Sequence, residues 1–120
     1  MAKHNETGQY GEDLAKNYLT DLGWQVVATN YRYGKAEVDL IAWDNKILVF
    51  AEVKTRRNQR YGYPEEAVSS KKESLMAAAA GAYMRAIDYD GELRFDIISI
   101  ILEPKLEIEH FRDAFFPGLM

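Results

Sequence analysis

The sequence contains no cysteine, and its two histidines, His4 and His110, lie far apart. The absence of cysteine excludes disulfide bonds, zinc-thiolate sites and thiol nucleophiles, and two widely spaced histidines cannot build a multi-histidine metal site. Any metal ion that this chain binds must therefore be held by oxygen ligands.

Long hydrophobic segments are also missing. The longest uncharged apolar runs, such as IISIIL at 97–102, are far shorter than the roughly 20 residues that span a bilayer. Met1 leads into polar residues instead of the apolar region of a signal peptide. No repeat or Pro/Gly/Ser linker divides the 120 residues, of which 48% are hydrophobic. We therefore expect one cytoplasmic domain over 1–120, with no membrane association.

The chain lacks the excess of basic residues that is typical of a general nucleic-acid binder, since its net charge is -4. Its charge is unevenly distributed, because residues 54–72 contain six basic residues and two acidic ones. This segment therefore carries +4 and the remainder -8. A positive patch on an acidic body is compatible with phosphate binding at one face, and a solvated loop and helix start is the alternative.

Hydrophobic periodicity predicts an α/β domain with the element order α-β-β-β-α-β-β. Gly23 is expected to end the first helix, and Ser70 with Glu73 forms a capping-box pattern at the start of the second. The predicted helices cover 7–22 and 71–87, and the predicted strands cover 24–31, 37–43, 46–54, 93–102 and 105–111. The predicted buried helix positions are Leu14, Ala15, Tyr18, Leu19, Leu22, Leu75, Ala78, Ala79, Ala82, Tyr83 and Ala86.

The segment EVDLIAWDNKILVFAEVK at 37–54 places charged residues within two otherwise apolar strands. A tight turn at Asp44-Asn45 would set Glu37 opposite Glu52 and Asp39 opposite Phe50. The charged residues of this segment's two strands, Glu37, Asp39, Glu52 and Lys54, would then share one face. The uninterrupted apolar face opposite would form the core, and this prediction depends on the register of the hairpin.

Two carboxylates directly opposite each other on a sheet repel, so their charge requires compensation. One alternative is a solvated pair that Lys35 and Lys54 partly neutralise. The other is a divalent cation bound between the carboxylates, since Mg²⁺ prefers such oxygen ligands. The pattern of residues leaves both alternatives open.

An ordered set of short motifs extends over most of the chain. They are GEDLA (11–15), NYR (30–32), EVDLIA (37–42), VFAEVKTR (49–56), PEEAV (64–68) and RFD (94–96). With them the chain is similar to the YraN-like family of small uncharacterised bacterial proteins, and it resembles the PD-(D/E)xK nuclease superfamily. One departure is Ala36, where the family pattern has glycine. The resemblance implies a single restriction-endonuclease-like domain with a central mixed sheet flanked by helices.

The resemblance also implies roles for individual residues. Asp39 and Glu52 would ligate Mg²⁺ or Mn²⁺ together with the carbonyl of Val53. Lys54 would position or help to deprotonate the attacking water, and Glu12 would reach the metal directly or through water. Glu37 would be an additional or water-mediated ligand. The basic segment would hold the neighbouring nucleic-acid backbone through Arg56, Arg57, Arg60, Tyr61, Lys71 and Lys72.

The expected function is therefore Mg²⁺-dependent hydrolysis of phosphodiester bonds in DNA, with branched or junction DNA as a candidate substrate. A non-catalytic nucleic-acid-binding module and a protein-interaction adaptor are the alternatives. The apolar end of the chain, AFFPGLM at 114–120, would either dock on the domain or form a homodimer contact. Asp96 is expected to pair locally with an arginine or a backbone donor, whereas His4 and His110 are expected at the surface without a role.

Overall fold

The computed structural model describes residues 6–58 and 69–115 of the chain. Arg60, Tyr61 and His4 lie outside these ranges, as do the last five residues. The elements are α1 (Glu6–Asp21), β1 (Gln25–Tyr33), β2 (Ala36–Asp44), β3 (Ile47–Arg56), α2 (Ser70–Ala86), β4 (Leu93–Ile101) and β5 (Glu107–Phe111). The predicted element order is confirmed, and each boundary lies within about two residues of its predicted position.

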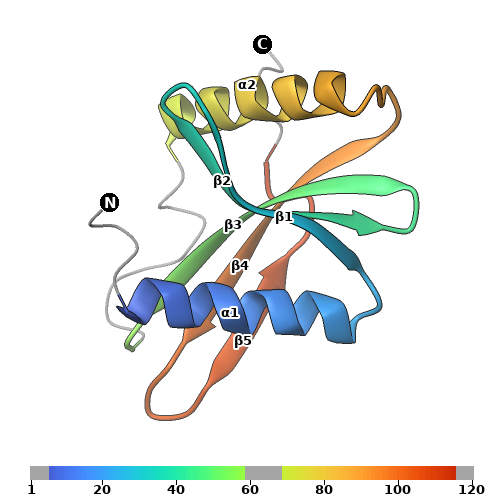
Figure 1. Cartoon of the computed structure of the whole chain (residues 1–120). Coiled ribbons are helices and arrows are strands. Elements are labelled where there is room, and N and C mark those ends of the chain that lie inside the picture. The colour runs from blue at the N-terminus through green and yellow to red at the C-terminus, as the bar shows by residue number, and fades with distance from the viewer. Residues whose placement is uncertain (1–5, 59–68, 116–120) are drawn as a thin grey trace.

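The strands form one five-stranded sheet in the order β1-β2-β3-β4-β5. β3 and β4 pair in parallel, and the other neighbours are antiparallel, so the predicted mixed sheet is confirmed. α1 covers one face of the sheet and α2 the other, which gives a three-layer α/β domain (Figure 1). In the described residues, neither α1 nor α2 combines the length and apolar composition needed to cross a membrane.

Hydrophobic residues are buried on both faces of the sheet. One core cluster packs Leu40, Val49 and Ala51 against α1. The other packs Phe50, Leu48 and further side chains against α2. The prediction of a single apolar core face was therefore wrong, because α2 covers the face that was expected to carry the charges.

The buried faces of the two helices were predicted only in part. Ala15 and Leu19 of α1 are fully buried as expected, but Leu22 is 43% exposed. In α2 the buried residues are Met76, Ala79 and Ala80, and the predicted Ala78 and Ala86 are exposed. The alanine-rich sequence of α2 is nearly uniform around the helix, so its periodicity could not identify the inward face. Its N-cap is Ser69, one residue before the predicted cap.

The β2–β3 hairpin turns at Asn45 and Lys46, because Asp44 pairs with Ile47. Asn45 has a φ of 55°, a conformation that asparagine tolerates in tight hairpin turns. The predicted register, with Glu37 opposite Glu52, was therefore wrong by two positions. The paired residues end at Leu40 and Ala51, so the two strands stop pairing just before Asp39 and Glu52.

The inward and outward alternation of β2 breaks at Asp39. Val38 packs in the α2 cluster, whereas Leu40 packs in the α1 cluster. In β1, Asn30 lies opposite Asp39, between the residues that pair with Leu40 and Val38, and it has a φ of 51°. Simple alternation therefore does not place all of the predicted charged residues on one face. They meet instead where β2 and β3 separate, and they are Glu37, Asp39, Glu52 and Lys54.

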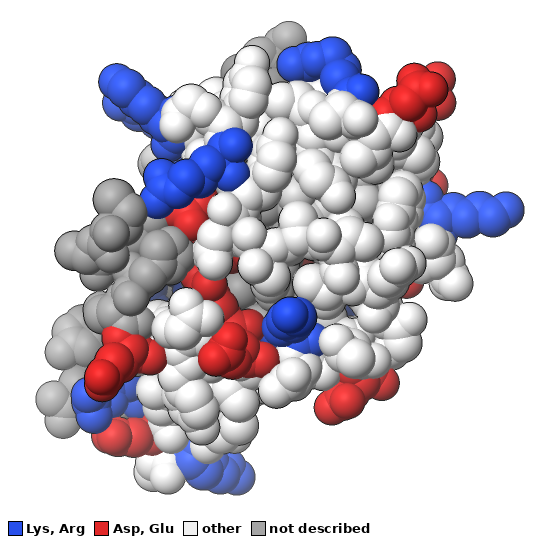
Figure 2. Space-filling model, in the orientation of Figure 1, with Lys and Arg blue, Asp and Glu red and all other residues white. Residues whose placement is uncertain are grey.

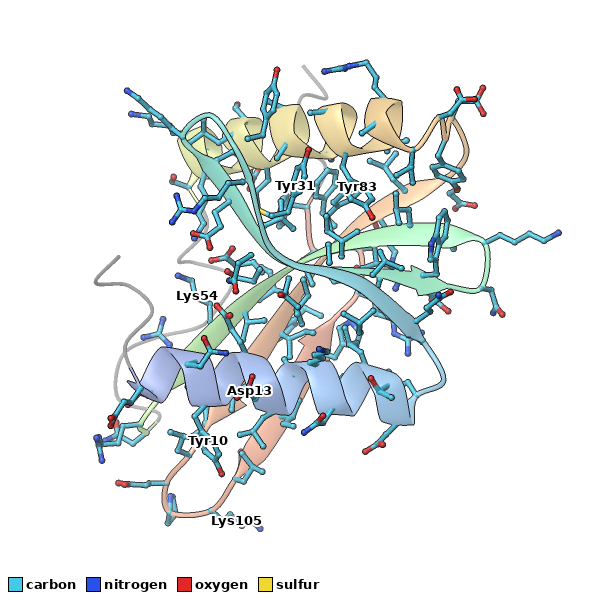
Figure 3. All side chains as sticks on the ribbon, viewed as in Figure 1. Tyr10, Asp13, Tyr31, Lys54, Tyr83 and Lys105 are labelled. Atoms are coloured by element: carbon cyan, nitrogen blue, oxygen red, sulfur yellow. The ribbon has the colours of Figure 1, made fainter. Side chains whose placement is uncertain are left out.

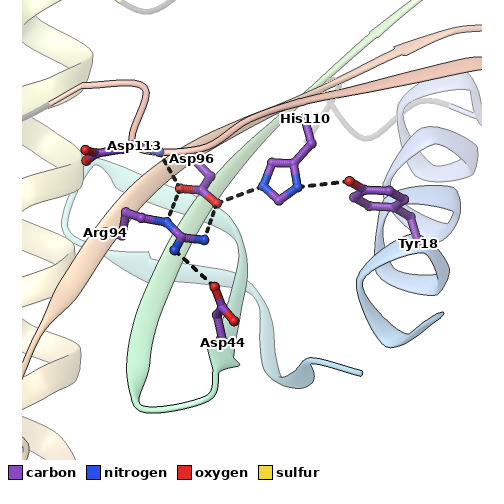
Figure 4. A network of polar contacts seen from close by, with 6 residues as sticks. All are labelled: Tyr18, Asp44, Arg94, Asp96, His110 and Asp113. Carbon is purple, nitrogen blue, oxygen red and sulfur yellow. Dashed lines mark hydrogen bonds and ion pairs between the residues drawn. The ribbon is translucent and has the colours of Figure 1, made fainter. Parts of the chain in front are cut away.

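A polar network on β4 connects several elements (Figure 4). Asp96 is 0% exposed and accepts two hydrogen bonds from Arg94, at 2.9 and 3.0 Å. It also accepts a hydrogen bond from the backbone N–H of Asp113, so its predicted local pairing is confirmed. Arg94 donates to Asp44 as well, at 3.0 Å.

His110 completes this network. It was expected at the surface, and that prediction was wrong. Its side chain is only 4% exposed, and its Nε2 lies 2.8 Å from Asp96 Oδ2. Tyr18 of α1 hydrogen-bonds to His110 Nδ1 at 3.1 Å. The sequence held a signal for this, because Ile108 and His110 alternate with Glu107 and Glu109. Ile108 packs in the α1 cluster, and His110 shares its inward face of β5.

The start of the predicted apolar tail lies against the domain. Phe115 packs in the α2 cluster, and its ring stacks on Phe95 with centroids 5.3 Å apart. The backbone N–H of Ala114 donates to the carbonyl of Phe95 at 2.7 Å. The described part of the tail therefore docks on its own domain, and the prediction of a homodimer contact stays untested.

Gly11 allows α1 to approach β3 closely. A Cβ atom at this position would lie 1.8 Å from Thr55 Oγ1, so Gly11→Ala should lower the free energy of unfolding by about 1–3 kcal/mol. Gly81→Ala in α2 is the matched control, since its nearest neighbour is the flexible end of Arg85 at 3.3 Å. It should be neutral or stabilising by up to about 1 kcal/mol. Urea denaturation measures both, and a Gly11→Ala variant as stable as wild type would contradict the close approach.

Candidate metal and nucleic-acid site

A pocket of about 570 Å³ opens between the N-terminal ends of α1 and α2, where β2 and β3 separate. It is lined by all five predicted catalytic residues, Glu12, Glu37, Asp39, Glu52 and Lys54, and by Val53, Lys71 and Lys72. Figure 3 shows Lys54 between α1 and α2, on the side of the molecule where both helices begin. Acidic and basic side chains gather on this side of the molecule, whereas the centre of the same face is mostly uncharged (Figure 2).

Asp39 is tied to the neighbouring strand by a hydrogen bond. The backbone N–H of Val53 donates to Asp39 Oδ2 at 2.8 Å. This bond fixes a β2 carboxylate beside β3 where backbone pairing has ended. Val53 was predicted to contribute its carbonyl to a metal ion, and this stays a prediction. Its N–H group has a different part, because it holds the Asp39 carboxylate in place.

Glu12 reaches the pocket from α1 and is oriented by Asn30. The Asn30 side-chain amide donates to Glu12 Oε1 at 3.0 Å. Asparagine suits this position for two reasons, since it tolerates the positive φ and carries a donor. Asn30 was not among the predicted site residues, although it belongs to the NYR motif.

Glu52 is the most buried carboxylate of the pocket, at 4% exposure. Its Oε2 lies 3.7 Å from Lys54 Nζ and contacts the ammonium group of Lys72. Lys72 was predicted as a nucleic-acid contact, but the structure places it in an ion pair with Glu52. The backbone N–H of Lys72 donates to the Ser69 hydroxyl at 3.1 Å, which fixes its place in the first turn of α2.

The remaining predicted residues lie at the rim of the pocket or beyond it. Glu37 lines the pocket, with its Oε1 3.7 Å from Arg32 Nη2, and Lys71 is exposed at the rim. Arg56 and Arg57 do not line the pocket, and Arg57 pairs with Glu103 at 3.2 Å. Of the predicted nucleic-acid contacts, the structure therefore brings only the two lysines of α2 into the pocket, whereas Arg60 and Tyr61 are among the residues that it does not describe.

Burial and neighbouring charge shift the protonation of the pocket. Burial, together with the negative charge of Glu52, raises the pKa of Asp39 to about 8, although the Val53 N–H bond opposes this. Burial and the positive charge of Lys72 lower the pKa of Lys54, against the opposing effect of Glu52. Without a bound cation, Asp39 is therefore mostly protonated at neutral pH.

The oxygen donors of the pocket suit a hard divalent cation. The negative charge of Glu52 destabilises the charged form of Asp39, and a cation between the two carboxylates would relieve this. In residues 6–58 and 69–115 no group of three or more His, Asp or Glu side chains is already arranged to hold a metal ion. A metal ion would therefore depend on the carboxylates of Asp39 and Glu52 and on the Val53 carbonyl. Glu12 lines the same pocket.

The raised pKa of Asp39 predicts a pH-dependent effect of Asp39→Asn on stability in EDTA. The folded protein holds the Asp39 proton up to about pH 8, whereas the unfolded chain releases it near 3.8. The stability from this group is full below pH 3.8 and is lost as the pH rises through 8. Asparagine keeps an acceptor for Val53 without this loss. The Tm of Asp39→Asn minus that of wild type should therefore increase from pH 5 to pH 9 in thermal denaturation, and a difference independent of pH would contradict the burial of this charge.

Comparisons with known proteins agree on one family. The model of "Uncharacterised protein family UPF0102" matches residues 11–100. A UPF0102 protein of Flavobacterium psychrophilum is 44% identical over 117 residues, which cover 97% of this chain and 98% of the relative. A UPF0102 protein of Solibacter usitatus is 47% identical over 111 residues, which cover 90% and 84%. Among solved structures, SfsA from Pyrococcus furiosus in complex with Ca²⁺ is a weak match. It has a TM-score of 0.34 and 15% identity, and the match covers 86% of this chain and 60% of that chain.

Proposed function

The chain belongs to the uncharacterised protein family UPF0102, and we propose that its pocket is the active site of a Mg²⁺-dependent nuclease that hydrolyses phosphodiester bonds in DNA. Family membership confirms the resemblance to YraN-like proteins. The observation that carries the proposal is the convergence of Glu12, Asp39, Glu52 and Lys54, from three separate elements, on one pocket. Branched or junction DNA is the narrower substrate that we propose.

Asp39, Glu52 and the Val53 carbonyl would hold Mg²⁺ or Mn²⁺, with Glu12 as a direct or water-mediated ligand. When bound, the metal ion supplies the Lewis acidity that polarises the scissile phosphate. The protein's own groups fix the carboxylates in place, through the Val53 N–H bond to Asp39 and the Asn30 amide bond to Glu12.

Lys54 would orient the attacking water and stabilise the negative charge that develops on the phosphate. Burial and the positive charge of Lys72 lower the pKa of Lys54, which raises the fraction of neutral amine that can accept a proton from the water. Lys71, exposed at the rim in the first turn of α2, would hold a neighbouring phosphate of the backbone.

The test is cleavage of labelled single-stranded, duplex, flap and four-way-junction DNA and of RNA, in Mg²⁺, Mn²⁺ or EDTA. Wild type should cleave at least one DNA substrate only when metal is present. Glu52→Gln should reduce the rate by at least about 100-fold, since it removes a charged ligand at constant shape. Glu109→Gln removes the same charge from an exposed position of β5 and should cleave like wild type.

Equal cleavage by wild type and Glu52→Gln would overturn the proposed site. If wild type binds DNA without cleaving it, and the affinity falls steeply as salt rises, the non-catalytic binding module replaces the nuclease. If the chain neither cleaves nor binds any member of the panel, the adaptor function is the remaining alternative.

A further inference from the structure

The ammonium group of Lys72 contacts the buried Glu52 carboxylate at the position where an incoming cation would bind. Lys72 belongs to α2, whereas Glu52 belongs to β3, so this ion pair connects two elements that enclose the pocket. Lys54 Nζ lies 3.7 Å from the same oxygen, which is beyond hydrogen-bonding distance. Lys72 is therefore the cation in direct contact with Glu52.

The position of Lys72 in the helix favours a negative partner. A cation in the first turn of a helix is disfavoured by the helix dipole, and Lys72 lies three residues after the N-cap Ser69. The Glu52 carboxylate compensates for this, and the ammonium group in turn balances the charge of Glu52. Glu52 and Lys72 thus form an ion pair inside the pocket, where a lysine already neutralises the most buried carboxylate.

Lys72 is fixed at its backbone but not at the end of its side chain. Its N–H bond to Ser69 holds the helix turn, whereas its side chain is 35% exposed and has four rotatable methylenes. A lysine of this kind can leave Glu52 without any change in the helix. The released ammonium group would remain at the mouth of the pocket, where Lys71 also lies.

We propose that Lys72 is a resident counter-ion of the pocket, which a divalent cation displaces from Glu52 and which then binds a substrate phosphate. This inference rests on the proposed function. Removal of Lys72 should therefore tighten metal binding in the absence of substrate. An anionic substrate that binds the released ammonium group should favour metal binding, so the two ligands are coupled through Lys72.

The first experiment measures Mn²⁺ affinity by isothermal titration calorimetry without nucleic acid. Lys72→Gln should bind Mn²⁺ at least about tenfold more tightly than wild type, because the competing charge is removed from Glu52. Lys16→Gln is the matched control, since it removes the same charge from an exposed position of α1 that does not line the pocket. It should change the affinity by less than about threefold. Affinity in Lys72→Gln that is equal to or weaker than in Lys16→Gln would overturn the proposal.

The second experiment follows the lysine ζ-group signals of the wild-type protein by NMR during a Mg²⁺ titration, so it does not depend on how well a variant folds. The Lys72 signal should shift as it leaves Glu52, and the signal of Lys16, on the exposed face of α1, should not. An unchanged Lys72 signal while the Glu52 carboxylate responds to Mg²⁺ would overturn the displacement.

The outcomes separate this inference from the proposed function. If wild type requires metal for cleavage but Lys72 does not respond, only the counter-ion inference fails. If Mg²⁺ displaces Lys72 but no DNA is cleaved, the inference holds and the nuclease function fails. If neither wild type nor Lys72→Gln binds Mn²⁺, both fail.

Discussion

Lys54→Met is expected to lower the rate of the proposed metal-dependent DNA cleavage by about 100- to 1,000-fold, because it removes the positive charge that would stabilise the reacting phosphate. Methionine keeps the length and apolar stem of lysine, so the partly buried side chain continues to pack. The loss should be in kcat. Mn²⁺ affinity should not weaken, since Lys54 Nζ lies 3.7 Å from Glu52 Oε2 and repels an incoming cation.

Single-turnover cleavage and calorimetric Mn²⁺ binding together test this prediction. Lys105→Met is the matched control, because Lys105 is exposed in the loop between β4 and β5, away from Lys54 (Figure 3). It should retain wild-type cleavage and wild-type binding. Full activity of Lys54→Met would show that Lys54 only pairs with the acidic side chains. A parallel loss of metal binding would instead indicate that the substitution disturbs the pocket.

Asp96→Asn is expected to lower the free energy of unfolding by about 3–5 kcal/mol, which is the usual cost of removing one partner from a buried ion pair. Asp96 is 0% exposed, and asparagine would remove the charge that pairs with Arg94 and replace one of the two acceptor oxygens by an amide donor that faces Arg94 and His110. Burial alone would raise the pKa of Asp96, but hydrogen bonds from His110 and Arg94 outweigh it and hold this pKa below its ordinary value.

Urea denaturation at pH 7 measures this loss, with Asp90→Asn as an exposed control that should change stability by less than about 0.5 kcal/mol. Because the folded-state pKa of Asp96 is lowered, its contribution is present above the unfolded pKa of 3.8 and is lost as the pH falls. The difference between wild type and Asp96→Asn should therefore shrink in acid. A loss below about 1 kcal/mol at pH 7 would mean that the network adds little to stability.

The sequence predicted the element order and the main acidic residues of the pocket, because these follow from local patterns. Asp39 and Glu52 are set in apolar strands on either side of a short turn, so they meet even though the predicted register was two positions off. In the observed register the two residues are the next facing positions after the Leu40–Ala51 pair, so the error did not separate them.

The features that the sequence did not predict depend on contacts between distant elements. Lys72 contacts Glu52 because the first turn of α2 lies beside β3 in the folded chain. Nothing near Lys72 in the sequence indicates that these two elements are neighbours. Asn30 is recognised as a site residue only once its side chain is seen to donate to Glu12. The second core cluster was missed because the alanine-rich surface of α2 shows no clear inward face.

The Val53 N–H bond to Asp39 shows how the sheet and the pocket depend on each other. In a longer hairpin this N–H group would bond to a carbonyl of the facing strand, and Asp39 would be one more residue in a continuous ladder. Here a carboxylate takes the place of that carbonyl, so the last rung of the hairpin is made by a side chain. Asp39 Oδ2 therefore lies at the point where the pairing of β2 and β3 ends and the pocket begins. A sequence change that extended the pairing of β2 and β3 by one residue pair would therefore give the Val53 N–H group a carbonyl acceptor and release Asp39, without altering any acidic residue of the pocket.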